Sequence, residues 1–263
     1  MESLNKMTVV VKDNGFGIKN IIINEPKTYN SLSFKTLKML IHTFKRLESD
    51  NKTRVIILSG NGKGFSAGHN LKEVGGIKNR SNHLKLFNLC SKLMMKIVEG
   101  KKPVIAKVHG AAYAAGCQLA ASCDLAYSTT NATFATPGVN IGLFCSTPMV
   151  AVSRKVTRKI MMKMLLTGDP INAKYAKEIG LINDCFSNKK LNIEVLKIAK
   201  KISSKSNLTI KIGKQAFYKQ LEMPLGDAYK FTSKMMTVNM ASQDAKEGIS
   251  AFLQKRKPSW KNK

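Results

Sequence analysis

Acidic side chains are scarce in this sequence. Lysine and arginine number 44 against 16 aspartates and glutamates, which gives a formal net charge of +28 at pH 7. Such an excess suits acidic partners, namely phosphate-bearing small molecules, nucleic acid or an anionic membrane surface. The lysines are spread along the chain rather than grouped in blocks, which favours a general compositional bias over a nucleic-acid-binding arm. We therefore do not expect nucleic acid to be a partner.

Paired cysteines and long apolar runs are also missing. The five cysteines form no CxxC pair and no metal-ligand spacing, so the sequence predicts no metal site. Their odd number, with no evident signal peptide, indicates reduced thiols in an intracellular protein. No segment has the roughly 18 to 20 consecutive apolar residues that a membrane-spanning helix needs. We expect a soluble protein of the cytoplasm or the mitochondrial matrix, without a clear transit peptide.

The order of the predicted elements indicates an α/β protein. Hydrophobic residues make up 43% of the 263 residues, enough for a sizeable core. In the first half, β-rich runs alternate with helical patterns, as in a layered α/β core. The expected strands are 8–12, 18–24, 55–59, 104–108, 125–128 and 133–135, and the expected helices begin at Phe34, after a Ser33 N-cap, and near Ser81.

Helical signals dominate after Thr147. We expect two regions, a core over residues 1–190 and a helical oligomerisation region over residues 191–263. The helices expected in this half are 148–155, 158–167, 173–179, 191–205, 208–220 and 225–240.

The segment Gly110–Asp124, which reads GAAYAAGCQLAASCD, follows the apolar run Val104–Val108. We interpret it as a buried strand, a tight turn of small residues and a helix that begins near Gly116. Such a turn points backbone N–H groups and the positive end of a helix dipole at one spot, which can hold an anion or a developing oxyanion. Small residues also let a helix pack closely on a sheet, so the segment alone does not decide between the two roles.

A glycine-rich loop over Gly60–Asn70 supplies a second half for such a site. Its end, Gly64–Glu73, reads GFSAGHNLKE, and here the chain resembles the crotonase (enoyl-CoA hydratase/isomerase) superfamily. The resemblance covers essentially the whole chain. Besides the two segments just named, it rests on Glu25–Lys27 with Asn30, Lys102–Ala106, Phe134–Pro137, Gly138–Pro148, Leu166–Ile171 and Gly248–Lys257.

The resemblance implies a ClpP/crotonase-like spiral of ββα units with a helical C-terminal region that builds trimers or paired trimers. It also implies that the carbonyl of an acyl-CoA thioester lies between the backbone N–H groups of His69 and Ala115. Two such donors stabilise an enolate oxyanion, and losing one typically reduces the rate by about 10²–10³. Coenzyme A would enter as part of the substrate, with no other cofactor.

The resemblance also assigns residues to substrate and CoA binding. Lysines suit the phosphates of CoA, although in so basic a chain each one is equally typical of a solvated surface. The last two assigned residues come from the C-terminal segment, of the same or a neighbouring subunit. The assigned residues are Lys27, Ala67, Asn70, Leu71, Lys72, Gly116, Phe252 and Lys255.

The proton-transfer groups of the family are absent. The resemblance implies two catalytic glutamates in hydratases, and here Gln118 and Gly138 occupy those positions. Ser146 aligns with the acid of the isomerases, and it and Gly138 are expected to line the acyl pocket. Glutamine orients water but exchanges no proton near pH 7. Each placed acid or base contributes typically about 10²–10⁴-fold, so we expect very low hydratase activity.

Several hypotheses stay open at this point. His69 has an ordinary pKa suited to proton transfer, but a space-filling role is equally consistent with the sequence. Cys117 follows a helix start, yet packing behind the helix is the better interpretation. The chain could catalyse reactions that need only enolate stabilisation, such as decarboxylation of a malonyl-type thioester, or thioester hydrolysis. It could also bind acyl-CoA without turnover. An RNA-binding face around Lys85 and Lys92 lacks interleaved aromatics and is disfavoured.

Overall fold

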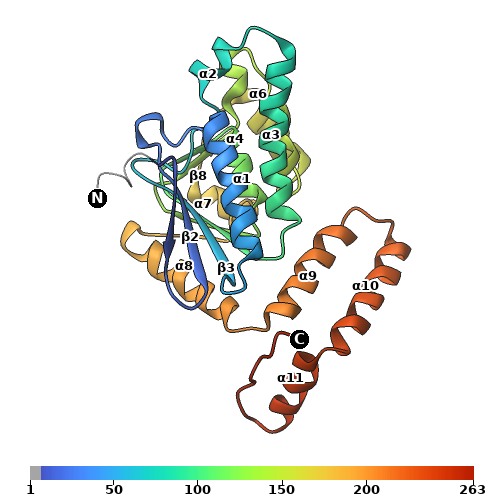
Figure 1. Ribbon diagram of the computed structural model, residues 1–263. Coiled ribbons are helices and arrows are strands. Elements are labelled where there is room, and N and C mark those ends of the chain that lie inside the picture. Colours follow the sequence, from blue (N-terminus) through green and yellow to red (C-terminus); the bar gives the residue numbers. More distant parts are fainter. Residues whose placement is uncertain (1–6) are drawn as a thin grey trace.

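The computed structural model describes residues 7–263 and contains two sheets surrounded by helices (Figure 1). The main sheet has six strands in the order β1-β2-β3-β4-β6-β9, and a smaller sheet has the order β5-β7-β8. The strands are β1 (Val9–Asp13), β2 (Ile18–Ile23), β3 (Val55–Gly60), β4 (Val104–Val108), β5 (Ala111–Tyr113), β6 (Leu125–Thr129), β7 (Thr133–Ala135), β8 (Ile171–Asn172) and β9 (Asp184–Phe186).

The helices connect these strands in the first two thirds of the chain and then continue alone. They are η2 (Pro26–Thr28), α1 (Phe34–Ser49), α2 (Leu71–Gly76), α3 (Arg80–Val98), α4 (Ala115–Ser122), η3 (Pro137–Ile141), α5 (Ser146–Val152), α6 (Arg158–Thr167), α7 (Ala173–Glu178), α8 (Asn188–Ser203), α9 (Asn207–Gln220), α10 (Leu225–Met240) and α11 (Gln243–Leu253). In the described residues 7–263, no helix has the length and apolar character needed to cross a membrane.

The main sheet is buried on both faces. It is parallel except for the β1–β2 hairpin, and parallel sheets need cover on both sides. Side chains alternate between the faces of a strand. Accordingly Ile56 and Leu58 of β3 belong to the large core under α1 and α3, whereas Val55 and Ile57 pack against α8. Figure 1 shows α1 and α3 on one side of this sheet and α8 on the other.

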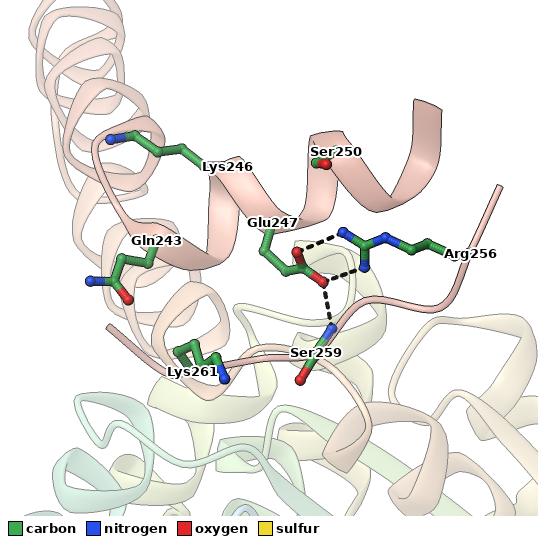
Figure 2. A pocket seen from close by; sticks show the side chains of 7 residues that line it. All are labelled: Gln243, Lys246, Glu247, Ser250, Arg256, Ser259 and Lys261. Atoms are coloured by element: carbon green, nitrogen blue, oxygen red, sulfur yellow. Dashed lines mark hydrogen bonds and ion pairs between the residues drawn. The ribbon is translucent and has the colours of Figure 1, made fainter. Parts of the chain in front are cut away.

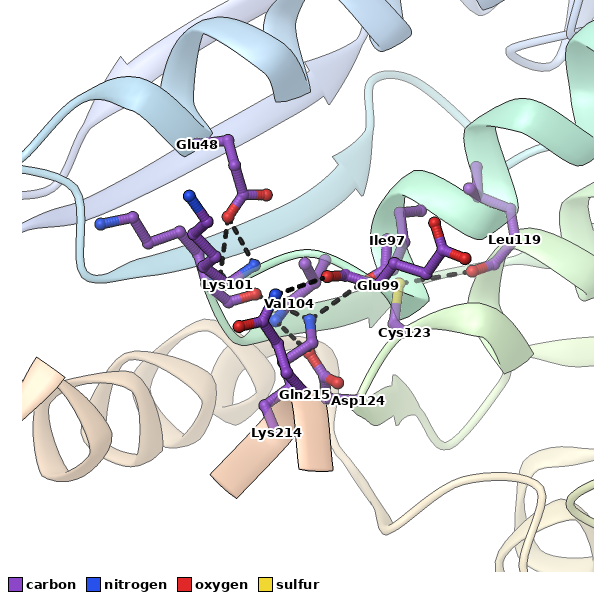
Figure 3. Close-up of polar contacts among 11 residues, drawn as sticks. Glu48, Ile97, Glu99, Lys101, Val104, Leu119, Cys123, Asp124, Lys214 and Gln215 are labelled. Carbon is purple, nitrogen blue, oxygen red and sulfur yellow. Dashed lines mark hydrogen bonds and ion pairs between the residues drawn. The ribbon is translucent and has the colours of Figure 1, made fainter. Parts of the chain in front are cut away.

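Lys214 of α9 ties the C-terminal helices to the core (Figure 3). Its Nζ donates to Oδ2 of Asp124 and to the carbonyl oxygens of Ile97 and Lys102, each at 2.8 Å. The same Asp124 oxygen accepts the N–H of Val104 at 2.6 Å. The two charged side chains are only 6% and 17% exposed. A buried ion pair needs such additional hydrogen bonds to offset its loss of hydration, and here the carbonyls supply them.

The helices beyond Lys214 have little core of their own. Ala216 and Ala228 are the buried residues of α9 and α10, and Figure 1 shows α9, α10 and α11 extending away from the sheets. Large apolar side chains are correspondingly exposed on this region. They include Phe217, Leu221, Leu225, Tyr229, Met236 and Phe252.

The C-terminal tail folds back onto α11 through two carboxylates. Buried Asp244 accepts the N–H groups of Lys261 and Asn262. Figure 2 shows Glu247 between Arg256 and the backbone of Ser259. The guanidinium of Arg256, at 2.7 and 2.9 Å from the two carboxylate oxygens, and then the Ser259 N–H hold the pKa of Glu247 at about 2. The tail is therefore fastened by charge and hydrogen bonds, together with the ring of Trp260, which lies beside Gly248 of α11.

Most elements expected from the sequence are confirmed, including the Ser33 N-cap, whose Oγ accepts the N–H of Thr36. The helices expected over 158–167 and 225–240 match α6 and α10 in their bounds. The helices expected over 148–155 and 191–205 are present but begin and end earlier, as α5 (from Ser146) and α8 (from Asn188). The short elements α2, β5, β8 and β9 and the helix α11 were not predicted. The α/β class with a helical C-terminal region is confirmed.

Candidate functional site

The glycine-rich loop and the segment after β4 run side by side. Ser66 and Ala112 form a parallel bridge, in which Ser66 N donates to Ala111 O at 3.1 Å and Tyr113 N donates to Ser66 O at 2.9 Å. The structure thus brings together the two segments that the sequence suggested as halves of one site. Two backbone N–H groups of the suggested site belong to the residue three positions after Ser66 and the residue three positions after Ala112.

Those two residues are His69 and Ala115. Within residues 7–263, neither backbone N–H has a hydrogen-bond acceptor. A Cβ atom on the intervening Gly68 would lie only 3.1 Å from the N of Ala115, so the two backbones are in close contact here. Ala115 is also the first residue of α4, where the helix dipole favours negative charge. Two free donors from two chain segments therefore lie at one helix N-terminus.

The close approach depends on glycine. A Cβ on Gly116 would overlap the carbonyl oxygen of Ser66, and one on Gly110 would overlap that of Lys63. Between them Ala114 has φ 46° and ψ −117°, a conformation that residues other than glycine rarely adopt. Strain of this kind persists only where the surrounding structure imposes it, and it is typical of functional sites.

Asn30 holds the glycine-rich loop in place. Its buried Nδ2 donates to the carbonyl oxygens of Asn61 and Gly64, both at 2.7 Å, and its Oδ1 accepts the N–H of Glu25. Its own carbonyl accepts the Ser66 hydroxyl at 2.9 Å. The sequence marked Asn30 only as part of a motif, with no role. Its position after Glu25–Lys27 gave no local signal for this role, because the loop residues that it holds lie more than 30 positions away.

The side chain of His69 packs in a largely apolar setting. Its Nδ1 is 3.2 Å from the carbonyl oxygen of Leu32, and its ring meets that of Phe87 edge to face. A carbonyl only accepts, so Nδ1 carries the proton and Nε2 is bare; Nε2 is buried and has no partner within residues 7–263. Burial lowers the pKa of His69, against smaller opposing effects of the Leu32 carbonyl and Glu73. At neutral pH the ring is therefore neutral, and its bare Nε2 is the atom that can accept a proton.

Glu73 is a carboxylate near the site that the sequence did not single out. Its oxygens accept the N–H of Phe34 at 3.0 and 3.3 Å and so cap α1, and its charge acts on His69. The loop motif contains this residue, but its contact with Phe34, 39 positions away, has no local signature. In the part of the chain that the structure describes, no group of three or more His, Cys, Asp or Glu side chains could hold a metal ion.

Comparison with known proteins assigns the chain to a family. A model of the enoyl-CoA hydratase/isomerase family matches residues 13–263. Human enoyl-CoA hydratase domain-containing protein 3, named as mitochondrial, is 49% identical over 244 residues, which are 93% of this chain and 80% of the human protein. The chain belongs to the enoyl-CoA hydratase/isomerase family.

Solved structures agree with this family assignment. The crystal structure of human enoyl-CoA hydratase domain-containing protein 3 has a TM-score of 0.94 at 47% identity and covers 97% of this chain and 100% of that one. An enoyl-CoA hydratase from Mycobacterium smegmatis has a TM-score of 0.95 at 42% identity, covering 97% and 99%. The crotonase fold is confirmed, as is similarity to the domain-containing protein 3 subgroup, which the segments Gly64–Glu73 and Gly138–Pro148 indicated.

The two positions that resemblance assigns to the family's glutamates differ in their surroundings. Gln118 is 4% exposed, and its Oε1 lies 4.0 Å from the sulfur of Cys90 in α3. A Cβ on Gly138 would lie 3.0 Å from Sγ of Cys145 and 2.9 Å from the carbonyl oxygen of Leu143. The Gly138 N–H itself donates to that sulfur at 3.3 Å. No acid is present at either position, and at Gly138 neighbouring atoms occupy the space for a side chain.

The remaining residues of this region are more ordinary. Ser146 is exposed at the start of α5, where its hydroxyl donates to the carbonyl of Phe144. Cys117 is fully buried, and burial raises its pKa to about 12, so it is a packing thiol rather than a thiolate. Burial likewise raises the pKa of Cys145. None of these groups has the chemistry of an acid or base at neutral pH.

The residues assigned to CoA binding fall into two groups. Lys27, Ala67, Leu71 and Lys72 are exposed around the glycine-rich loop, and Asn70 accepts the N–H groups of Lys72 and Glu73 as the N-cap of α2. Phe252 and Lys255 lie at the end of α11, and Figure 1 shows α11 and α2 at opposite ends of the molecule. One chain does not bring these two groups together.

Proposed function

We propose that the chain binds an acyl-CoA thioester, with the thioester oxygen between the backbone N–H groups of His69 and Ala115. The observation that carries this proposal is that both N–H groups lack an acceptor among residues 7–263, where the Ser66–Ala112 bridge and Gly68 bring the two segments together at the start of α4. Membership of the enoyl-CoA hydratase/isomerase family supports an acyl-CoA substrate. Lys27 and Lys72, exposed beside the loop, would meet the CoA phosphates.

The chemistry that we propose for this site is enolate stabilisation without the hydratase acids. Gln118 exchanges no proton near pH 7, and the atoms of Leu143 and Cys145 exclude an acid from position 138. Losing both acids corresponds to a reduction of roughly 10⁴-fold or more in hydration. Decarboxylation of a malonyl-type thioester fits better. The bond to CO₂ breaks, its electron pair becomes the enolate, the two N–H groups hold the resulting oxyanion, and water supplies the proton that the α-carbon then takes.

Thioester hydrolysis and binding without turnover are the alternatives. The bare Nε2 of His69 supports hydrolysis, because a neutral imidazole can take a proton from an attacking water. Binding without turnover is supported by the absence of acids at positions 118 and 138.

A panel of thioesters separates these possibilities. We expect calorimetric binding of crotonyl-CoA, and hydration of crotonyl-CoA at least about 10⁴-fold below an ordinary hydratase. Release of CO₂ from malonyl-CoA with formation of acetyl-CoA supports the decarboxylase, free thiol supports the hydrolase, and binding with neither product supports the binder. Hydration within about tenfold of an ordinary hydratase contradicts the proposal, as does an absence of acyl-CoA binding.

The exposed apolar side chains of α9, α10 and α11 support a trimer or a pair of trimers. A neighbouring subunit would then bring Phe252 and Lys255 to the CoA site, which a single chain does not do. The division at residue 191 stays a prediction, although α8 beyond it packs on the sheet. The relatives named as mitochondrial support an intracellular location, cytoplasmic or in the mitochondrial matrix. Sedimentation of the full chain checks the assembly.

A further inference from the structure

A separate cavity of about 440 Å³ lies between the start of α8 and the carboxyl ends of β3, β4 and β6. Ligands of parallel α/β sheets bind at the carboxyl ends of the strands. Four chain segments far apart in the sequence meet here. Their polar side chains at the cavity are Lys63, Lys107, His109, Thr129, Asn131, Asn188 and Asn192.

The cavity is positively charged and uncompensated. Lys63 and Lys107 line it, and none of the described residues that line it is acidic. Nζ of Lys107 donates to Oδ1 of Asn192 at 2.8 Å, a neutral partner. Burial, and then the nearby charge of Lys12, lower the pKa of Lys107, which reflects a cation without a counter-ion. An anion in this cavity would be stabilised by both ammonium groups.

The N-terminus of α8 points at the same place. This helix has 16 residues, and within residues 7–263 its N-cap Ser187 makes no side-chain capping bond. The N–H groups of Lys190 and Leu191 bond to the carbonyl of Ser187, whereas those of Asn188 and Lys189 have no acceptor among the described residues. Free N–H groups at a helix N-terminus are donors for phosphate.

Thr129 provides an independent sign of a missing ligand. Alternate residues of a strand share a face, so the side chain of Thr129 lies on the same face of β6 as those of Leu125 and Tyr127. Those two side chains pack against the apolar residues of α8. Thr129 is 3% exposed and lines the cavity, and its Oγ1 has no hydrogen-bond partner within residues 7–263. Buried hydroxyl groups nearly always make a hydrogen bond, so we expect the partner of this hydroxyl to be a ligand.

We propose that this cavity is an anion site that binds a phosphate group through Lys63, Lys107, the Thr129 hydroxyl and the first N–H groups of α8. The ligand is either free phosphate or a phosphomonoester. This site is distinct from the proposed CoA site, whose lysines, Lys27 and Lys72, do not line it. It does adjoin the glycine-rich loop and the segment that follows β4. Nε2 of His109, just after β4, lies 2.8 Å from the carbonyl oxygen of Gly62 in that loop.

The test is calorimetric titration of the full chain with orthophosphate and, separately, with 5′-AMP, at constant ionic strength set by sodium chloride. We expect a dissociation constant of about 1 mM or below for at least one of them. Lys63 is exposed, so Lys63→Met removes a charge without disturbing the fold, and it should weaken binding about tenfold. The near-isosteric Thr129→Val, which removes only the hydroxyl, should weaken it severalfold.

A matched control makes the outcome specific. Lys92→Met removes the same charge from the exposed face of α3 and should keep wild-type affinity for the phosphate probe. Tighter binding of orthophosphate assigns free phosphate to the site, and tighter binding of AMP assigns a phosphomonoester. Wild-type protein that binds neither probe overturns the proposal, as do equal losses in Lys63→Met and Lys92→Met. Lys27→Met is measured alongside: a loss of phosphate or AMP affinity there as large as in Lys63→Met would place the probe at the proposed CoA site and overturn the proposal.

Discussion

The sulfur of Cys145 lies 3.0 Å from the point where a Cβ on Gly138 would be. The departure from the family's hydratases at this position is therefore more than a missing carboxylate. The segment from Leu143 to Cys145 occupies the space, and the Gly138 N–H donates to the sulfur. A side chain at position 138 requires backbone movement, because the carbonyl oxygen of Leu143 is equally close.

Gly138→Ala should lower the free energy of unfolding by about 1–3 kcal/mol, the usual effect of overpacking a filled site. Chemical denaturation measures it. Gly75→Ala is the matched control: in the described part of the chain nothing lies within 4 Å of its Cβ position, and alanine favours the helix over glycine by roughly 0.5–1 kcal/mol. Equal stability of Gly138→Ala and wild type would contradict the filled space.

Asn30→Ala should destabilise the chain and weaken acyl-CoA binding together. It leaves the carbonyls of Asn61 and Gly64 and the N–H of Glu25 without partners, and each such loss typically costs about 1–3 kcal/mol when the group stays buried. Denaturation and crotonyl-CoA calorimetry measure the two effects. Asn51→Ala, at an exposed loop position, should change neither. A variant that loses stability but binds crotonyl-CoA as wild type does would exclude Asn30 as a positioning residue.

Lys214→Met should reduce stability by about 3–5 kcal/mol, since it leaves the largely buried carboxylate of Asp124 without its cation. The same change at exposed Lys234 on α10 is the control, with an expected effect within about 0.5 kcal/mol. Limited proteolysis provides a second measurement. Cleavage around α9 should become faster in Lys214→Met, and unchanged cleavage would mean that other contacts hold α9 to the core.

His69 should make stability depend on pH. Burial lowers its folded-state pKa below the ordinary value of 6.5, so the unfolded chain binds the proton more readily. Its contribution is complete above about pH 6.5 and is lost as the pH falls toward the folded-state pKa. Denaturation at several pH values between about 7.5 and 5 should give a steeper loss for wild type than for His69→Gln. Parallel curves would contradict this assignment.

Local patterns were sufficient for most of the fold. Buried strands such as Val55–Gly60 stand out by their apolar runs, and the Ser33 cap with its periodic apolar residues defines α1. The short β5 escaped prediction because three residues of alanine and tyrosine have no strand signature of their own; pairing with Thr133–Ala135 makes them a strand. Helix α11 is held by contacts with the tail that no local pattern indicates: Asp244 accepts N–H groups of the tail, and the ring of Trp260 lies beside Gly248.

The sequence by itself determined the family, the α/β order of elements and the absence of acids at positions 118 and 138, because these depend only on which residues are present and how they are spaced. Only the tertiary structure decided how side chains distant in sequence meet. It turned Oε1 of Gln118 toward Cys90 and placed Cys145 in the space beside Gly138. It also gathered Lys63, Lys107 and Thr129 at the start of α8. Such encounters depend on strand order and helix packing, which no local pattern specifies.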